Sequence, residues 1–141
     1  KMFMGDSGSY LFGSLVALNI IETNNLNPDI SSFFFCILLF YLFFEVFFSF
    51  FRKLYLRRSP LKPDANHLHM LLYNFLEKSQ KFKDCNYINS IVINLVYFCL
   101  IFPAIFFIYN GPASKYLFFC FLVIYMVFYF LLYSFEKKQS N

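Results

Sequence analysis

The chain of 141 residues has no tryptophan, only two histidines and four glycines, and only 14% of its residues are charged. Ordinary soluble domains carry roughly 25% charged residues. Hydrophobic residues make up 60% of the chain. A small soluble domain leaves a large share of its surface in water, so it could not hide so much apolar surface. The composition argues against a soluble domain and against a disordered chain, and it indicates a membrane protein.

The four cysteines also exclude some classes of protein. Cys36, Cys85, Cys99 and Cys120 lie far apart, and three of them sit inside apolar runs. This spacing matches neither a metal site nor a disulfide framework. We expect these side chains to act as small buried hydrophobic groups.

Long apolar runs predict the fold. A helix needs about 20 mainly apolar residues to cross the hydrocarbon core of a bilayer. Residues 32–51, 88–109 and 116–135 meet this length directly, and a fourth run at about 3–22 is rich in glycine and serine. Small residues suit close packing between membrane helices, although an ordinary half-buried helix is the alternative for this run. The sequence predicts an all-α, polytopic transmembrane helix bundle of about four spans, which forms one domain over residues 1–141.

Basic residues are distributed unequally between the two sides of this predicted bundle. If four spans alternate, every Lys and Arg except Lys115 falls on one side, mostly in the long connection at residues 52–87. The positive-inside rule assigns that side to the cytoplasm. We therefore expect a multi-pass protein with both ends in the cytoplasm.

A polar motif lies at residues 5–9, where the sequence reads GDSGS. Asp6 at a helix start has three physical uses: it caps the helix, complements the helix dipole, or binds a hard cation such as Mg²⁺. Gly5 and Gly8 would let the backbone approach a phosphate closely. The motif alone does not choose between a plain helix cap and a binding site.

A second polar motif lies in the long connection, at residues 57–71 (RRSPLKPDANHLHML). Asp64 is placed to cap a helix predicted over residues 67–78. His67 and His69 would share one face of an extended segment, and histidine can donate hydrogen bonds to phosphate oxygens near neutral pH. Beside several basic side chains, we expect the partner to be an anionic phosphate.

Other interpretations of this connection stay open. A zinc site built from both histidines and Asp64 lacks a further ligand nearby. A basic face that touches anionic lipid headgroups is the simpler alternative. We expect no nucleic-acid partner, since such a surface mixes aromatic and basic residues on a solvated face.

Glu45 is the only carboxylate inside the three long apolar runs. A charged side chain at the bilayer centre costs at least about 2.5 kcal/mol, so it is by default functional or paired. Glu45 lies roughly 10 Å before Arg52 at the rise of a helix. It either reaches the site on the cytoplasmic side or pairs with a basic residue on another helix.

Together these residues resemble a known family. Residues 3–9 (FMGDSGS) resemble the F-M-G-D-x-G-S signature of the polyprenyl-phosphate N-acetylhexosamine-1-phosphate transferases, which serve bacterial envelope polysaccharide synthesis. Their second signature has an acidic residue seven before an Arg, followed by P-F-x-x-D-x-x-H-x-H-H. Glu45, Arg52 and residues 60–69 (PLKPDANHLH) resemble it in the same order.

The resemblance implies a reaction and roles for individual residues. N-acetylhexosamine-1-phosphate would pass from a UDP-sugar to undecaprenyl phosphate, releasing UMP, at the cytoplasmic face of a bacterial inner membrane. Asp6 would be catalytic as the Mg²⁺ ligand, and His67 would be catalytic with Asp64 supporting its loop. Substrate binding would fall to His67, His69, Arg58, Gly5, Gly8 and Ser9.

The chain also departs from the family pattern. Met70 replaces the last histidine, Leu61 the phenylalanine and Glu45 the usual aspartate; Met70 argues against the peptidoglycan branch. The family's paired aspartates would lie upstream, which predicts the C-terminal part of a longer enzyme that is inactive alone. The alternative is a non-catalytic membrane protein or pseudoenzyme with a lipid-binding basic loop. The sequence leaves the oligomeric state open, with a homodimer as one assembly it allows.

Overall fold

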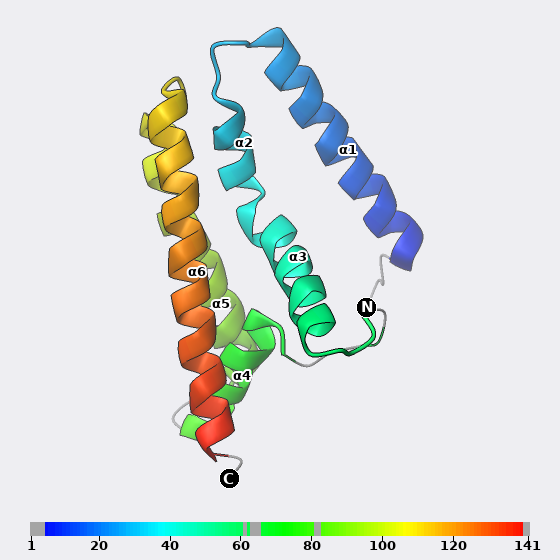
Figure 1. Ribbon diagram of the computed structural model, residues 1–141, viewed down its shortest axis with the longest axis vertical. Helices are drawn as coiled ribbons and strands as arrows, with labels where there is room; N and C mark the ends of the chain where they lie inside the picture. The colour runs from blue at the N-terminus through cyan, green and yellow to red at the C-terminus, as the bar shows by residue number, and fades with distance from the viewer. Residues whose placement is uncertain (1–4, 61, 63–65, 81–82, 140–141) are drawn as a thin grey trace.

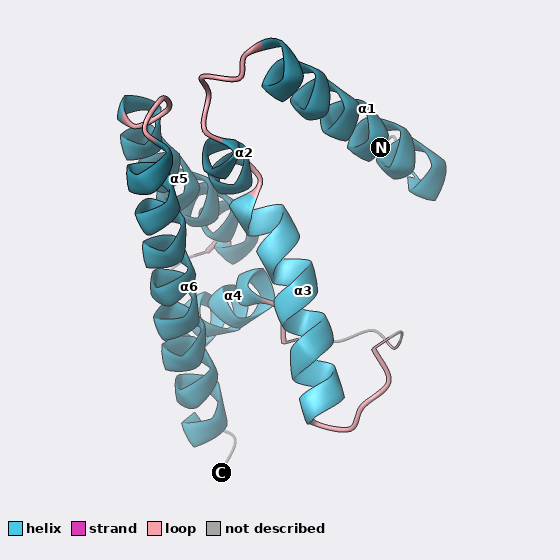
Figure 2. Ribbon diagram, turned by 45° about the horizontal axis from the view of Figure 1, so that its top comes forward, coloured by secondary structure: helices cyan, strands magenta, loops and turns pink. Residues whose placement is uncertain are grey.

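A computed structural model gives the fold, and it describes residues 5–60, 62, 66–80 and 83–139. Six helices form over these residues, with no strand among them (Figures 1 and 2). They are α1 (Gly5–Leu26), α2 (Ser32–Leu38), α3 (Phe40–Tyr55), α4 (Leu68–Ser79), α5 (Cys85–Phe106) and α6 (Gly111–Gln139). The all-α prediction is confirmed.

Two helices of the described chain, α5 and α6, are long and apolar enough to cross a membrane. The pair α2 and α3 makes a third span if it is counted as one, but the two helices meet at an angle of 74°. The part of the chain that the structure describes therefore has two or three helices suited to a bilayer. The run at residues 32–51, predicted as one helix, is broken.

The break lies at Leu39, whose φ of −103° and ψ of 5° leave the helical range. A break within a membrane exposes backbone polar groups that must find partners inside the protein. The hydroxyl of Tyr97 on α5 donates to the carbonyl of Leu38, and the amide of Leu39 still donates to the carbonyl of Phe35 at 3.1 Å. The bend is thus stabilised by a neighbouring helix.

The fourth predicted span corresponds to α1, which is a helix but has no buried residue. Its many Ser, Asn and Thr residues make α1 more polar than α5 and α6, and it is not one of the described helices that are apolar enough to cross a membrane. These side chains bond the carbonyl four residues earlier, as Ser14 does with Tyr10 at 2.7 Å and Thr23 with Asn19 at 2.7 Å. Figures 1 and 2 show α1 leaning away from the other helices.

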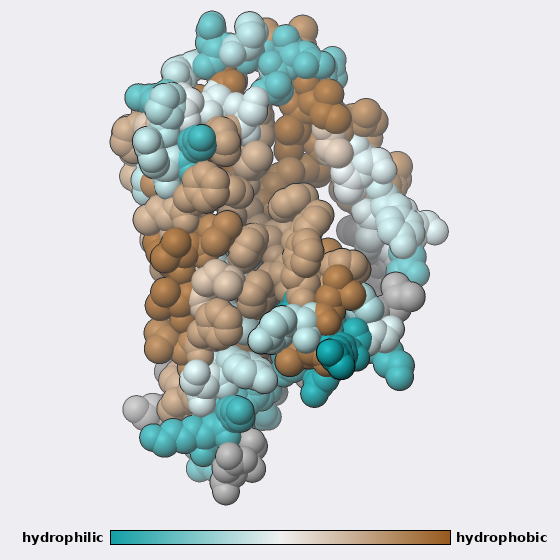
Figure 3. Space-filling model, in the orientation of Figure 1, coloured by the Kyte–Doolittle hydropathy of each residue, from teal (hydrophilic) through white to brown (hydrophobic). Residues whose placement is uncertain are grey.

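The connections sort to opposite ends of the molecule. The amide of Ser31, after α1, donates to the carbonyl of Ile108, after α5, at 2.8 Å, so the two short connections meet at one end. Figure 1 shows the long connection and α4 at the other end. In Figure 3 a hydrophobic band separates two hydrophilic ends. This arrangement agrees with the one-sided placement of basic residues in the sequence.

The core forms where α6 packs against α2, α4 and α5. Rings dominate it: Phe40 contacts Phe118, Phe121 and Tyr125 edge to face. The prediction of buried cysteines is wrong, as shown by Cys36, Cys99 and Cys120, which are exposed, and Cys85, which is half-buried. The outer faces of α5 and α6 carry many exposed hydrophobic side chains, so Cys99 and Cys120 are as suitable there as inside.

Candidate active site at the long connection

The two histidines lie side by side where the long connection enters α4. His67 is the extended residue that precedes the helix, with φ −78° and ψ 150°. The rings of His67 and His69 stack with centroids 5.7 Å apart and an angle of 17° between their planes. His67 is half-buried and His69 is exposed. The two imidazoles lie side by side although only His67 is extended, because His69 already belongs to α4.

Glu45 of α3 holds this segment from inside the bundle. Its Oε1 lies 3.0 Å from Nδ1 of His67 and accepts the amide of Leu68 at 2.8 Å. Its Oε2 accepts the hydroxyl of Tyr125 on α6. Glu45 is only 9% exposed. These hydrogen-bond donors offset the cost of burying its carboxylate. Of the two readings of Glu45, the structure supports the one in which it reaches the histidine segment.

The amide of Leu68 is one of the first four in α4, which lack partners within a helix. A carboxylate at that end also complements the helix dipole. The helix predicted over residues 67–78 corresponds to α4 (Leu68–Ser79). Glu45 of α3 accepts a hydrogen bond from the first turn of that helix. Asp64, predicted as the cap and as a catalytic residue, lies outside the described residues.

A second set of contacts holds the backbone just before the histidines. Nη1 of Arg52 on α3 donates to the carbonyl of Asn66 at 2.7 Å and to the hydroxyl of Tyr129 on α6. That hydroxyl donates to the same carbonyl at 3.1 Å. We call Glu45, Arg52, Tyr125 and Tyr129 the α3–α6 clamp. It holds residues 66–68 between two helices.

Further polar contacts fix both sides of the clamped segment. Lys53, which is 8% exposed, donates from Nζ to the carbonyl of Lys62 at 2.7 Å and to that of Pro60 at 3.2 Å. Nδ2 of Asn89 on α5 donates to the carbonyl of His69 at 3.1 Å. Helices α3, α5 and α6 thus all contribute to the position of the two imidazoles.

The basic side chains predicted to face substrate remain at the surface. Arg58, assigned to substrate binding, is exposed, as are Arg57 and Lys62. Arg57 adopts a φ of 53°, and the amide of Arg58 donates to the carbonyl of Lys53 at 2.8 Å. This turn lies at the start of the long connection and leaves its cationic groups exposed.

The Gly5 to Ser9 motif forms the first turns of α1. Gly5 has a φ of 62°, a value that glycine adopts readily, and Oγ of Ser9 donates to its carbonyl at 3.0 Å. Asp6 is exposed and Gly8 is half-buried. Among the described residues no hydrogen bond or ion pair joins this motif to His67. The structure therefore gathers one predicted half of the site but does not bring the two halves into contact.

Asp6 can be weighed as a Mg²⁺ ligand on its chemistry. Mg²⁺ usually binds one or two carboxylates and completes its shell with water and substrate phosphates. Asp6 offers an exposed carboxylate, and it belongs to no group of three or more His, Cys, Asp or Glu within the described ranges. These residues fit a magnesium ion that takes one protein carboxylate and otherwise binds water and phosphate.

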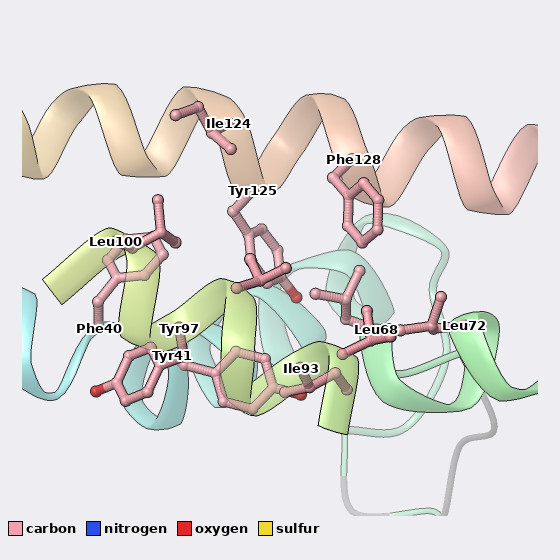
Figure 4. Close-up of a pocket in the computed structure, with 12 residues that line it drawn as sticks. Phe40, Tyr41, Leu68, Leu72, Ile93, Tyr97, Leu100, Ile124, Tyr125 and Phe128 are labelled. Carbon is pink, nitrogen blue, oxygen red and sulfur yellow. The ribbon is translucent and has the colours of Figure 1, made fainter. Parts of the chain in front are cut away.

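An apolar cavity of about 190 Å³ adjoins the clamp (Figure 4). Its walls come from the start of α3, from α4, α5 and α6. Tyr125 and Leu68 line it, and both also bond to Glu45. The polar site and the apolar interior of the bundle therefore share two residues.

Comparison with known proteins shows a similarity to a curated transferase. The chain is 29% identical, over 101 residues, to an undecaprenyl-phosphate alpha-N-acetylglucosaminyl 1-phosphate transferase of Thermotoga maritima, an alignment that covers 58% of this chain and 33% of the relative. The chain is thus similar to a sugar-1-phosphate transferase. It spans about a third of the length of that relative. No family model matches the chain, and no solved structure matches it.

Sequence reasoning missed the residues that α6 contributes to this candidate site. Tyr125 and Tyr129 lie four residues apart and so share one face of a helix. On α3, Glu45, Ser49 and Arg52 follow one another at intervals of four and three residues, which also places them on one helix face. The signal available was a row of polar residues on one face of α3 together with two tyrosines on one face of α6. It names neither the partner helix nor the atoms that bond.

Proposed function

We propose that the protein transfers N-acetylhexosamine-1-phosphate from a UDP-sugar to undecaprenyl phosphate, as part of a longer chain, at the cytoplasmic face of a bacterial inner membrane. The observation that carries this proposal is the similarity to a curated transferase with that type of lipid acceptor. It is supported by the gathering of Glu45, Arg52 and His67, three residues of the second signature, in one site.

The reaction joins two anionic phosphates. An oxygen of undecaprenyl phosphate forms a bond to the phosphorus that carries the sugar. The bond from that phosphorus to the bridging oxygen breaks, its electrons stay on that oxygen, and UMP leaves. Because both reactants are negatively charged, the site must neutralise phosphate oxygens and hold them in line. Cationic and hydrogen-bonding side chains are therefore the groups to assign.

We assign the sugar nucleotide to the end of the molecule where the histidines lie. His67 and His69 would donate to the diphosphate, and the exposed guanidinium of Arg58 would add positive charge. Gly5, Gly8 and Ser9 would contact phosphate at the start of α1, and Asp64 would support the histidine loop. Asp6 would hold Mg²⁺, which when bound neutralises charge on the phosphates.

The lipid acceptor explains why such a site belongs beside apolar helices. Undecaprenyl phosphate keeps its chain in the bilayer and its phosphate at the surface. The one-sided basic residues and the exposed apolar faces of α5 and α6 suit both parts of such a substrate.

The test uses the intact protein in membranes, with a labelled UDP-N-acetylhexosamine, undecaprenyl phosphate and Mg²⁺. Asp6→Asn should abolish Mg²⁺-dependent release of UMP and leave membrane insertion unchanged. Asp29→Asn is the matched control, because Asp29 is also exposed but lies in the short connection at the opposite end. Normal turnover of the Asp6 variant would remove its metal role.

His67 is tested separately. His67→Ala should mainly raise the KM for the UDP-sugar, since the imidazole is assigned to the diphosphate. An unchanged KM and an unchanged rate would exclude the phosphate contact.

A second candidate is a non-catalytic membrane protein whose basic connection binds anionic lipid. The exposed Arg57, Arg58 and Lys62 favour it. Such a protein would bind vesicles containing anionic lipid and release no UMP with any nucleotide sugar. Loss of vesicle binding on replacing these three residues, with no turnover in the unchanged protein, would favour this candidate.

A further inference from the structure

The carboxylate of Glu45 meets three donors at once. Oε1 lies 3.0 Å from Nδ1 of His67 and accepts the amide of Leu68 at 2.8 Å, and Oε2 accepts the hydroxyl of Tyr125. An ionised carboxylate can only accept hydrogen bonds. Nδ1 is therefore the ring nitrogen that the carboxylate engages, and Nε2 is the ring nitrogen open to another ligand.

The orientation of the ring is also restrained from other directions. The imidazole of His69 stacks on it at 5.7 Å, and the backbone on either side is bonded at Asn66 and Leu68. The side chain of His67 is nevertheless 29% exposed. A ring that is held on several sides and still reaches solvent is suited to binding a ligand through one defined atom.

We infer that Glu45 is a positioning residue for His67: its carboxylate accepts a hydrogen bond from Nδ1 and so orients the ring, whose Nε2, carrying the second proton of the ring when the ligand is bound, donates to a phosphate oxygen of the sugar nucleotide. This inference rests on the proposed function and adds to it a residue that acts through His67. The link through the amide of Leu68 ties the ring to the first turn of α4. Any shift of α3 relative to α4 would therefore move the imidazole.

A second acidic residue provides a comparison within the same fold. Oε1 of Glu136 on α6 accepts Nδ2 of Asn74 on α4 at 2.7 Å. Glu136 thus joins α4 to the bundle, as Glu45 does, but it bonds to neither histidine. Glu136→Ala removes a helix-to-helix contact alone, which makes it the matched control for Glu45→Ala.

The first experiment measures the ring itself and needs no turnover. The sequence contains only two histidines, so ¹⁵N labelling of histidine gives few ring signals, and His67→Asn and His69→Asn assign them. We expect a protonated Nδ1 on His67 in the unchanged protein and in Glu136→Ala. In Glu45→Ala the proton should leave Nδ1 for Nε2 in a large share of molecules. An unchanged His67 spectrum in Glu45→Ala would overturn the inference.

The second experiment measures kinetics. In metal sites, a residue that orients a ligating histidine is worth about 10- to 100-fold in metal affinity or activity, and we take the same scale for His67. Glu45→Ala should therefore raise the KM for the UDP-sugar by about 10-fold or more, with little change in the KM for undecaprenyl phosphate. Glu45→Gln, which keeps an acceptor oxygen, should recover most of this loss. A glutamine variant as impaired as the alanine variant would show that charge alone matters and would overturn the positioning role.

A double-mutant comparison separates positioning from folding. If Glu45 acts through His67, then Glu45→Ala should cost little further in a His67→Asn background, because coupled residues are not additive. Equal losses in both backgrounds would overturn the inference. Failure of the proposed function would appear differently: the unchanged protein would release no UMP, while the ¹⁵N spectra would still decide whether Glu45 sets the proton on His67.

Discussion

Replacing Tyr129 by phenylalanine tests the α3–α6 clamp most directly. The substitution removes one hydroxyl and leaves a ring that is 1% exposed in its packing. The hydroxyl accepts from the guanidinium of Arg52 and donates to the carbonyl of Asn66 at 3.1 Å. A hydrogen bond to a charged group contributes about 1.5–3 kcal/mol and one between neutral groups about 0.5–1.5 kcal/mol.

Part of this energy survives the substitution, because Arg52 keeps its own bond to the carbonyl of Asn66 at 2.7 Å. We therefore expect local opening of residues 66–68 to become easier by about 2 kcal/mol. Because about 1.4 kcal/mol corresponds to a tenfold change in an equilibrium constant, opening should rise roughly 30-fold. Amide hydrogens protected by the clamp, that of Leu68 among them, should exchange faster in proportion.

The assay is hydrogen exchange by mass spectrometry on the protein in lipid nanodiscs, following peptides that cover residues 66–72. Tyr133→Phe is the control, since Tyr133 lies one turn further along α6 and its ring stacks on Tyr129. Within the described chain its hydroxyl makes no hydrogen bond. Equal exchange in the two variants would refute the role given to the clamp.

Three further predictions follow from the packing and the topology. Leu72→Ala should destabilise the protein by about 2–5 kcal/mol in reversible unfolding, since this buried side chain holds α4 against the bundle. Tyr97→Phe should cost about 1–3 kcal/mol in the same assay, because the carbonyl of Leu38 at the bend loses its donor inside an apolar region. Single cysteines at Arg58 and Lys115, in a protein freed of its own cysteines, should react with a membrane-impermeant reagent from opposite faces of the bilayer. Labelling of both from one face would contradict the proposed topology.

Much of the secondary structure could be read from the sequence, because helices in lipid are set by local properties. The apolar runs at residues 88–109 and 116–135 correspond to α5 and α6, and the apolar spacing after His67 corresponds to α4. Length and hydropathy suffice for these helices, since every backbone group in a membrane must be satisfied within its own segment. The bend at Leu39 depends instead on a hydroxyl supplied by a distant helix, so no local pattern announced it.

The candidate site shows the same division. The candidate residues could be picked out from the sequence alone: a carboxylate among phenylalanines, two histidines two residues apart and a run of basic side chains stand out because burying them has a cost. The fold was needed to show that Glu45 bonds to the first turn of α4 and to His67. It was also needed to show that Tyr125, 80 residues after Glu45, and Tyr129, 77 residues after Arg52, complete the clamp. Contacts between residues so far apart depend on how helices pack, and helix packing is a property of the whole bundle.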